Sequence, residues 1–317
     1  ITGTNAVSYV WQPGGTTTTS ITVSPAITTT YTVTGTNANG CTATATRTIT
    51  VNTLPNINTS VSNAAICAGN STTITGTGGV SYVWQPGGST TTSITVSPAN
   101  TTTYTVTGTG SNGCTKTSTR TITVTQPTVL QLKFYIQGFY LGAGLMRNVL
   151  ANQSISTAAN GCDSVDVSLV DSATCNTIVT KRALVLTNGN CTVNLGLCLT
   201  AKYYIVVKHR NALETWSKYT VSMTGSPTYD FSNLITKAYG DNQKQMAPGI
   251  FAFYSGDCFK DASEAVDNQD IGTIEIQNSL FGFGFLPQDI NGDGNVDLDD
   301  FPIPQDNNDN FRFVTKP

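Results

Sequence analysis

Hydroxyl-bearing and apolar residues alternate through most of the first 127 residues, in runs such as TYTVTGT and TRTITV. Because successive side chains of a strand point to opposite faces, the alternation places threonine hydroxyls on one face and Ile122 and Val124 on the other. Pro-Gly-Gly and Asn-Gly sequences, which favour tight turns, separate the runs. Short strands joined by frequent turns predict an all-β fold of immunoglobulin-like sandwiches.

The alternating region is an internal repeat. Residues 1–51 and 74–124 differ at only eight positions, so the chain holds two copies of one module. The segment that opens the second copy has no counterpart in the first. We therefore expect an incomplete Ig-like repeat at 1–53 and a complete one at 54–127.

Two tryptophans, Trp11 and Trp84, and two cysteines, Cys41 and Cys114, occupy equivalent places in the repeats, whereas Cys67 has no counterpart in the first repeat. Trp11 and Trp84 lie in the same predicted strand, where a buried sandwich anchor is expected and ligand stacking is the alternative. Cys67 and Cys114 are expected to form a disulfide across the second sandwich. Cys41 matches Cys114, but its partner would fall before the first residue. We expect upstream sequence or a neighbouring subunit to supply that partner on a completing strand.

The sequence of the second repeat, from YVWQPGG to NGCTKTSTRTITV, resembles the Ig-like (PKD-like) repeats of very large cell-surface proteins of Bacteroidetes. The resemblance covers residues 1–125. Further along, FYIQGFY and YYIVVKHRNALETWS resemble the C-terminal module of the same proteins, which a dockerin-like calcium-binding segment follows. The resemblance implies a secreted cell-surface protein built from tandem domains.

The pattern changes after residue 127. Aromatic-rich strands such as LQLKFYIQGFY and AKYYIVVKH predict a second type of β-sandwich at 128–256, followed by a dockerin-like segment at 257–317. Eight cysteines in a threonine-rich β protein favour an oxidising, extracellular compartment. Cys191–Cys198 is the first pairing expected in this region, and the remaining connectivity stays open. No cysteine or histidine spacing is typical of zinc.

Charge is distributed unevenly. All 19 acidic residues lie after residue 127, whereas the only cations before it are Arg47, Lys116 and Arg120. A region without carboxylates or histidine has almost no means of general acid–base catalysis and cannot build a carboxylate metal site. Neither region is basic enough to indicate nucleic-acid binding. No apolar run is long enough to predict a membrane-spanning helix.

His209 is the only histidine, and it ends a predicted strand beside Arg210. No nucleophile-elbow motif accompanies it, so a structural histidine is expected rather than a catalytic one. The resemblance to Bacteroidetes proteins adds one further expectation. Ser164 and Ser172 lie in Asp-Ser-apolar sequences of the kind that these bacteria glycosylate, which implies glycosylation of both hydroxyls.

The sharpest motif is DINGDGNVDLDD. In an EF-hand-type loop, oxygen donors at fixed positions surround the ion and a glycine makes the sharp turn between them. Hard oxygen ligands at this spacing suit Ca²⁺, and an aspartate at the last position is the dockerin-like variant. The expected ligands are Asp289, Asn291, Asp293, the carbonyl of Asn295, Asp297 and Asp300.

Dockerins carry two such loops, and the resemblance therefore raises the question of a second calcium ion. The candidate is VDNQDIGTIEIQN, with Ile274 at the inward-facing position. Ile271 would then occupy a ligand position, which it cannot fill, and a shift by one residue would use Asp270 instead. The candidate ligands of this open alternative are Asp267, Gln269, Asp270, Thr273, Glu275 and Asn278.

These observations predict a non-catalytic extracellular structural protein. It would form the C-terminal part of a cell-surface stalk, filament or adhesin that associates with itself and is stabilised by calcium and disulfides. The alternative is a module on the cell surface in which residues 130–317 bind a polysaccharide or a partner. An enzyme would need a carboxylate pair in a cleft, and the acids outside the calcium loops are too scattered to nominate one.

Overall fold

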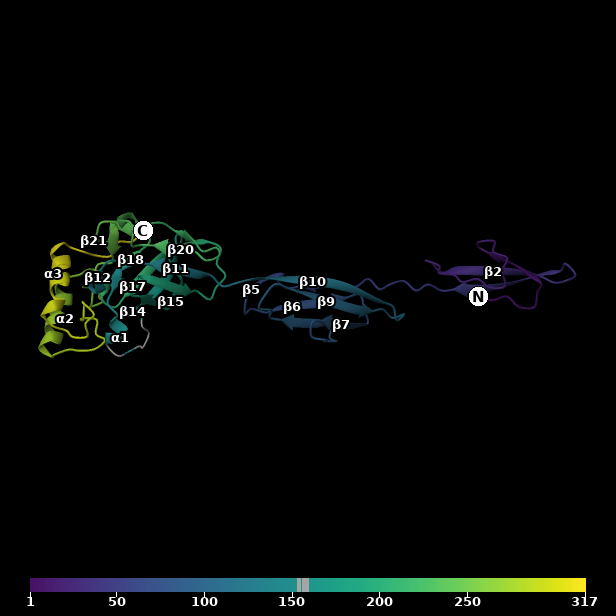
Figure 1. Ribbon diagram of the computed structural model, residues 1–317, viewed down its shortest axis with the longest axis horizontal. Coiled ribbons are helices and arrows are strands. Elements are labelled where there is room, and N and C mark those ends of the chain that lie inside the picture. The colour runs from purple at the N-terminus through teal and green to yellow at the C-terminus, as the bar shows by residue number, and fades with distance from the viewer. Residues whose placement is uncertain (153–154, 156–159) are drawn as a thin grey trace. The chain divides into compact units, whose positions relative to one another are not determined.

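The computed structural model describes residues 1–152, 155 and 160–317. The chain forms two compact units, Ile1–Thr125 and Gln126–Pro317, each of which is described by itself (Figure 1). No helix in the described ranges is long and apolar enough to cross a membrane.

The first repeat is a three-stranded antiparallel sheet, in the order β1 (Ser8–Gln12), β2 (Thr29–Thr36) and β3 (Thr42–Ile49). Its register sets threonines opposite threonines on one face, as the alternation predicts. Trp11 lies on the other face, 1% exposed, and its Nε1–H donates to the carbonyl of Thr18 at 2.9 Å. The anchor role expected for this tryptophan is confirmed.

The second repeat is a sandwich of two sheets. One sheet has the order β5-β10-β9-β7 and the other the order β4-β6-β8. Apolar side chains from both sheets pack around Trp84, which is fully buried and donates to the carbonyl of Thr91 at 2.9 Å. Ile122 is fully buried and Val124 packs against the same core, as predicted. The strands are β4 (Asn58–Val61), β5 (Ala65–Cys67), β6 (Thr72–Thr77), β7 (Ser81–Gln85), β8 (Ser93–Val96), β9 (Thr102–Thr109) and β10 (Thr115–Thr125).

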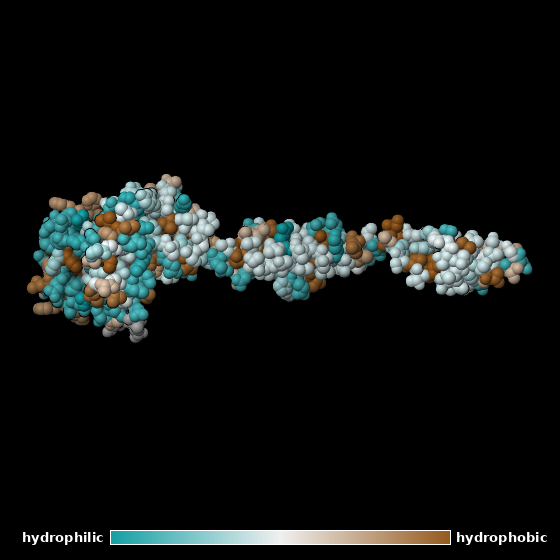
Figure 2. Space-filling model, turned by 45° about the horizontal axis from the view of Figure 1, so that its top comes forward, coloured by the Kyte–Doolittle hydropathy of each residue, from teal (hydrophilic) through white to brown (hydrophobic). Residues whose placement is uncertain are grey.

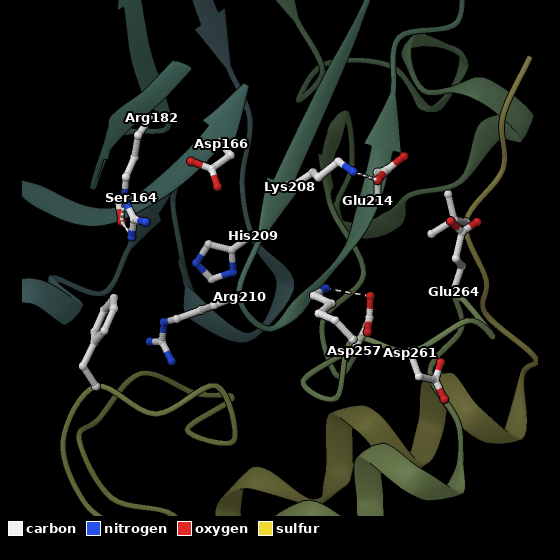
Figure 3. A pocket seen from close by; sticks show the side chains of 13 residues that line it. Ser164, Asp166, Arg182, Lys208, His209, Arg210, Glu214, Asp257, Asp261 and Glu264 are labelled. Atoms are coloured by element: carbon white, nitrogen blue, oxygen red, sulfur yellow. Dashed lines mark hydrogen bonds and ion pairs between the residues drawn. The ribbon is translucent and has the colours of Figure 1, made fainter. Parts of the chain in front are cut away.

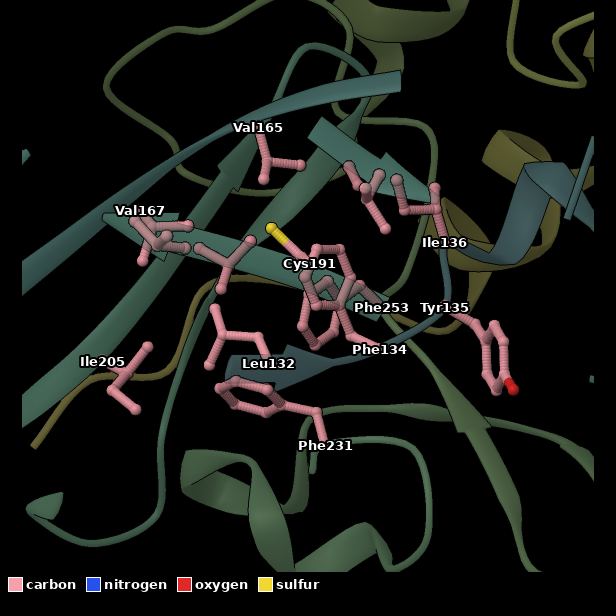
Figure 4. Close-up of a cluster of buried hydrophobic side chains, with 14 of the residues drawn as sticks. Leu132, Phe134, Tyr135, Ile136, Val165, Val167, Cys191, Ile205, Phe231 and Phe253 are labelled. Carbon is pink, nitrogen blue, oxygen red and sulfur yellow. The ribbon is translucent and has the colours of Figure 1, made fainter. Parts of the chain in front are cut away.

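The second unit is built on one eight-stranded sheet of order β18-β17-β14-β15-β16-β11-β20, with β19 paired to β17. The register between β15 and β16 pairs Val185 with Cys191. Side chains from strands along the sheet share one core, which Figure 4 shows around Leu132, Val167 and Phe253. The strands are β11 (Val129–Lys133), β14 (Gly161–Asp171), β15 (Thr177–Leu186), β16 (Asn190–Asn194), β17 (Lys202–His209), β18 (Ala212–Trp216), β19 (Val221–Ser222) and β20 (Thr228–Asp230).

Short elements complete the second unit. Helix α3 begins with two prolines in its first turn, where a missing backbone N–H breaks no helical hydrogen bond. The hairpins are β12 (Tyr140–Gly142) with β13 (Leu145–Met146) and β21 (Lys244–Ala247) with β22 (Ile250–Ala252), and the helices are α1 (Val149–Asn152), α2 (Asn268–Ser279), α3 (Pro302–Asp309) and the single 3₁₀ turns η1 (Gln137–Phe139), η2 (Ile235–Lys237), η3 (Tyr239–Asp241) and η4 (Leu298–Asp300). The described chain is thus predominantly β, as predicted.

The predicted disulfide between Cys67 and Cys114 is wrong. Cys67 is disulfide-bonded, but Cys114 carries a free thiol. β5 runs parallel to β10 with Cys67 opposite Thr125, whereas Cys114 directly precedes the first residue of β10. At about 3.3 Å per residue, that strand separates the two cysteines by roughly 36 Å. A disulfide needs Cα atoms about 4–7 Å apart.

The predicted Cys191–Cys198 disulfide is also wrong. Cys191 has a free thiol and lies on the core-facing side of β16, whereas Cys198 is disulfide-bonded and follows the strand in an irregular segment. Alternation along β16 therefore turns the Cys191 side chain into the core. Cys41 is free and exposed, and the strand expected to carry its partner stays a prediction.

Candidate functional site

The twelve-residue loop expected to bind calcium is closed around two buried carboxylates. Asp289 Oδ1 accepts hydrogen bonds from the backbone N–H groups of Gly292 (2.8 Å) and Asp293 (3.1 Å), and its Oδ2 accepts from Gly294 (3.1 Å). Gly294 adopts a φ of 101°, which is accessible mainly to glycine. The sharp turn expected at this glycine is therefore present.

Asp300 closes the loop from its other end. Its Oδ1 accepts from the N–H groups of Ile290 (2.7 Å) and Asn291 (3.1 Å), and its Oδ2 accepts from Asp297 N–H at 2.9 Å. Each carboxylate oxygen can accept more than one hydrogen bond or ligand contact. The backbone contacts therefore fix both side chains in place and leave acceptor capacity for a cation.

The remaining expected ligands lie along the turn between these carboxylates. Asn291 Oδ1 accepts from Asp293 N–H at 2.8 Å, and Asp293 Oδ1 accepts from Asn295 N–H at 3.0 Å. Asp297 begins the η4 turn as its N-cap and bonds reciprocally with Asp300. These residues occupy the places that the motif predicts, but their coordination of an ion stays a prediction.

Negative charge is costly in this loop. Burial, with Asp300 close by, raises the pKa of Asp289 to about 6, although the nearby Arg210 guanidinium lowers it. Burial likewise raises the pKa of Asp300 above its ordinary value. A bound cation would relieve both effects, because opposite charge favours the ionised carboxylate.

The loop is attached directly to the sandwich. The Asn211 side chain donates from Nδ2 to the carbonyl of Asp289 at 3.0 Å, and Arg210 donates to the carbonyl of Leu286. Gly138 lies so close to the Ile290 carbonyl that any Cβ there would collide with it. An ion held by the loop would therefore stabilise the sandwich as well as the loop.

The donor chemistry of the loop suits a hard divalent cation, since it offers carboxylate, amide and backbone oxygens. In the described ranges, no three His, Cys, Asp or Glu side chains converge as a metal-binding group. Ca²⁺ also takes amide and carbonyl ligands, which is why the Asn291 side chain and the Asn295 carbonyl are among the expected ligands. The residues present fit calcium by type and spacing.

The second calcium loop predicted from the sequence, VDNQDIGTIEIQN, is wrong. Asp267 is the N-cap of α2, and Gln269, Thr273 and Glu275 follow along that helix. A helix projects its side chains outward around its axis, so these residues cannot encircle one ion. Asn278 also lies on α2, near its end.

Asp267 and Asp270 belong to a different loop, Asp257–Asp270. Asp270 Oδ1 accepts from Cys258 N–H and Phe259 N–H, both at 2.8 Å, as Asp300 does from the residues that follow Asp289. Burial raises the pKa of Asp270 to about 6. The sequence carries a signal for this frame that we missed, because the pattern Val-Asp-x-x-Asp occurs at 266–270 and again at 296–300.

His209 forms part of a buried ionic cluster. Its Nε2 lies 3.0 Å from Asp163 Oδ2, and Arg210 Nε donates to the same oxygen at 3.0 Å. Burial raises the pKa of Asp163, but the bond from His209 and the charge of Arg210 outweigh it and lower that pKa overall. This arrangement supports the structural role expected for His209.

A pocket of about 430 Å³ opens on the outer face of the sheet beside the Asp257–Asp270 loop (Figure 3). A row of alternating charge crosses its floor, because Arg182, Asp166 and Lys208 are neighbours on adjacent strands and Lys208 Nζ lies 2.6 Å from Glu214 Oε2. Phe285 lines the wall of the pocket, and the Arg210 guanidinium carbon lies over its ring, 4.3 Å from the ring centre. The pocket offers hydrogen-bond donors and acceptors in alternation rather than one sign of charge.

The two expected glycosylation sites differ in setting. Ser164 lies on β14 and its Oγ accepts from Arg182 Nη2 at 2.6 Å, whereas Ser172 is exposed in the turn after β14. The Asp171 side chain holds that turn through bonds from Ala173 and Thr174 N–H. Glycosylation of both serines stays a prediction.

No family model and no curated protein matches this chain. Among solved structures, BcpA, the major pilin subunit of Bacillus cereus, is 11% identical over 70% of this chain and 93% of its own, with a TM-score of 0.30. A 1.5-MDa bacterial ice-binding adhesin is 19% identical over 70% of this chain and 85% of its own (TM-score 0.22). The amphioxus IgVJ-C2 molecule is 14% identical over 38% and 91% (TM-score 0.20). Likeness at this level says nothing about function.

Proposed function

We propose that the chain is a non-catalytic structural protein of the cell surface, part of a stalk, filament or adhesin whose second unit is stabilised by Ca²⁺. The observation that carries the proposal is the 289–300 loop. Its two end carboxylates are buried, and its backbone is bonded to the sandwich through Asn211 and Arg210. Calcium bound there would have a structural role.

The size of the effect follows from linkage. An ion that binds only the folded state adds RT ln(1 + [L]/Kd) to the free energy of unfolding, about 2.7 kcal/mol at a hundredfold excess over Kd. For a unit of this size, each kcal/mol moves the melting temperature by about 2–4 °C. Chelation should therefore lower the melting temperature of the second unit by roughly 5–10 °C.

Calorimetry of the full chain in calcium and in chelator tests the proposal. In calcium, Asp293→Ala should lower the melting temperature of the second unit about as far as chelator does. Asp299→Ala is the matched control, because Asp299 is exposed in the same loop and is not an expected ligand. Identical melting of the second unit with calcium and with chelator would overturn the calcium proposal.

A second candidate function is the binding of a polysaccharide in the pocket beside the Asp257–Asp270 loop. The alternating row from Arg182 to Glu214 favours it, because sugar hydroxyls both donate and accept hydrogen bonds. A glycan array probed with the full chain provides the test. Saturable binding to one glycan that Asp166→Asn weakens would favour this function, and an empty array would argue against it.

A further inference from the structure

The C-terminal segment contains two equivalent halves, residues 257–284 and residues 289–314. Phe281 and Phe311, which are 30 positions apart, both adopt a φ of 51° and are 87% and 83% exposed. Asp267 and Asp297 are both N-caps with the same reciprocal bonds to the aspartate three residues later. The halves therefore share backbone conformation as well as the Val-Asp-x-x-Asp pattern.

Each half completes the other by equivalent backbone bonds. Val266 N–H donates to Arg312 O at 2.9 Å, and Val296 N–H donates to Gly282 O at 2.8 Å. In the same way, Ala265 forms an antiparallel β-bridge with Phe313, and Asn295 forms one with Phe283. This reciprocity fixes the correspondence from Ala265 onward in the first half and from Asn295 onward in the second.

Asp270 accepts from the N–H groups of Cys258 and Phe259 as Asp300 does from those of Ile290 and Asn291, which places Asp257 at the position of Asp289 and Lys260 at that of Gly292. Backbone N–H groups bond to the side chain of Asp289, as described above. The side chain of Asp257 instead lies 2.6 Å from the ammonium of Lys260, which also donates to the carbonyl of Ala212 at 2.7 Å. Asp257 is nearly buried, with 6% of its side chain exposed, so the lysine charge offsets a carboxylate with little access to water.

The first half has also lost donors for an ion. Phe259 stands at the position equivalent to Asn291, and an aromatic ring cannot ligate calcium. Two extra residues lengthen the loop, and Asp261 turns away to accept from the N–H and hydroxyl of Ser263 at 2.8 and 2.6 Å. A divalent ion beside Asp257 would also be repelled by the neighbouring ammonium.

We infer that the loop at 257–270 is a cation loop whose ion has been replaced by the Lys260 ammonium, so the segment takes one divalent ion, in the 289–300 loop. This inference rests on the proposed function of that loop. In the first half, an ammonium tethered to the chain supplies the positive charge at all times and bonds the loop to Ala212 on β18. The two halves then have the same fold but differ in their dependence on calcium.

Calcium stoichiometry tests the inference. Native mass spectrometry and calorimetric titration of the full chain with CaCl₂ should give one ion per chain, and none after Asp293→Ala. Two ions in the wild type, or one that survives Asp293→Ala, would overturn the inference. A wild type that binds no ion would instead overturn the proposed function, so the two failures are distinguishable.

Lys260 itself is tested by thermal unfolding. Lys260→Gln removes the charge that offsets Asp257 and should lower the melting temperature by the same amount in calcium and in chelator. Lys260→Arg, which keeps the charge, should restore most of the loss. A Lys260→Gln protein that melts like the wild type in both conditions would overturn the role of the ammonium.

Discussion

The second unit contains one imidazole, that of His209, which is buried and neutral. His209 is the only histidine of the chain and is 5% exposed. Its Nδ1 accepts from Asn211 N–H at 3.3 Å and its Nε2 faces Asp163, which together define the neutral tautomer with a proton on Nε2. Burial lowers the pKa of His209 even though Asp163 raises it, so the ring stays neutral below its ordinary pKa.

The titration of His209 is therefore a clean prediction. Since the folded pKa lies below the unfolded value of about 6.5, the neutral ring contributes its full stability above about pH 6.5, and that stability is lost as the pH falls through the folded pKa. The loss cannot exceed about 1.4 kcal/mol per pH unit, because one proton is involved. NMR should show one imidazole resonance whose midpoint lies below 6.5 in calcium-saturated protein. A midpoint at or above 6.5 would contradict the buried neutral ring.

At the scale of elements, alternation and loop spacing could be read from the sequence, but contacts between distant strands could not. The period of two predicted the threonine face and the buried Ile122 because both depend on local geometry. The cysteine pairing failed because it depends on which end of β10 the short strand β5 meets. The 257–270 loop was missed because its ligand pattern differs from that of the 289–300 loop. It has two extra residues, and Phe259 stands where the other loop has Asn291, but the fold is the same.

Strand faces also predict which thiols react. Cys41 and Cys175 are exposed and Cys114 is partly exposed, whereas Cys191 and Cys258 are buried, as is Cys162. Burial raises the pKa of both Cys191 and Cys258 to about 12, which suppresses the reactive thiolate. Maleimide should label Cys114 and Cys175 in native protein and the three buried thiols only after unfolding, as peptide mass spectrometry can show. Native labelling of Cys191 would contradict this prediction.

At the scale of the whole molecule, the two units differ in surface chemistry. The repeats contain no carboxylate or histidine, and Figure 2 shows their surface as largely pale, of intermediate hydropathy. Threonine pairs such as Thr30–Thr48 and Thr103–Thr121 bond across strands at 2.8 Å. On these sheets, neutral hydroxyls thus form the side-chain contacts between strands that charged pairs such as Lys208 and Glu214 form in the second unit.

The difference predicts two independent responses in calorimetry. The transition of the first unit should not move with chelator, nor between about pH 3 and pH 8, because it contains no side chain that titrates in that range. The transition of the second unit should move with both. A first-unit transition that shifts with calcium would show that the repeats depend on the ion-binding loop.

The parallel pairing of β5 with β10 has a mechanical consequence. The chain enters the second repeat through β4 and β5 and leaves it through the far end of β10, so tension on its ends pulls β5 and β10 in opposite directions along one axis. The bonds between them, such as Ala68 N–H to Thr125 O and Thr123 N–H to Ala64 O, then bear the load together. A repeat loaded in shear would stay folded under a pull that peels a hairpin open one bond at a time.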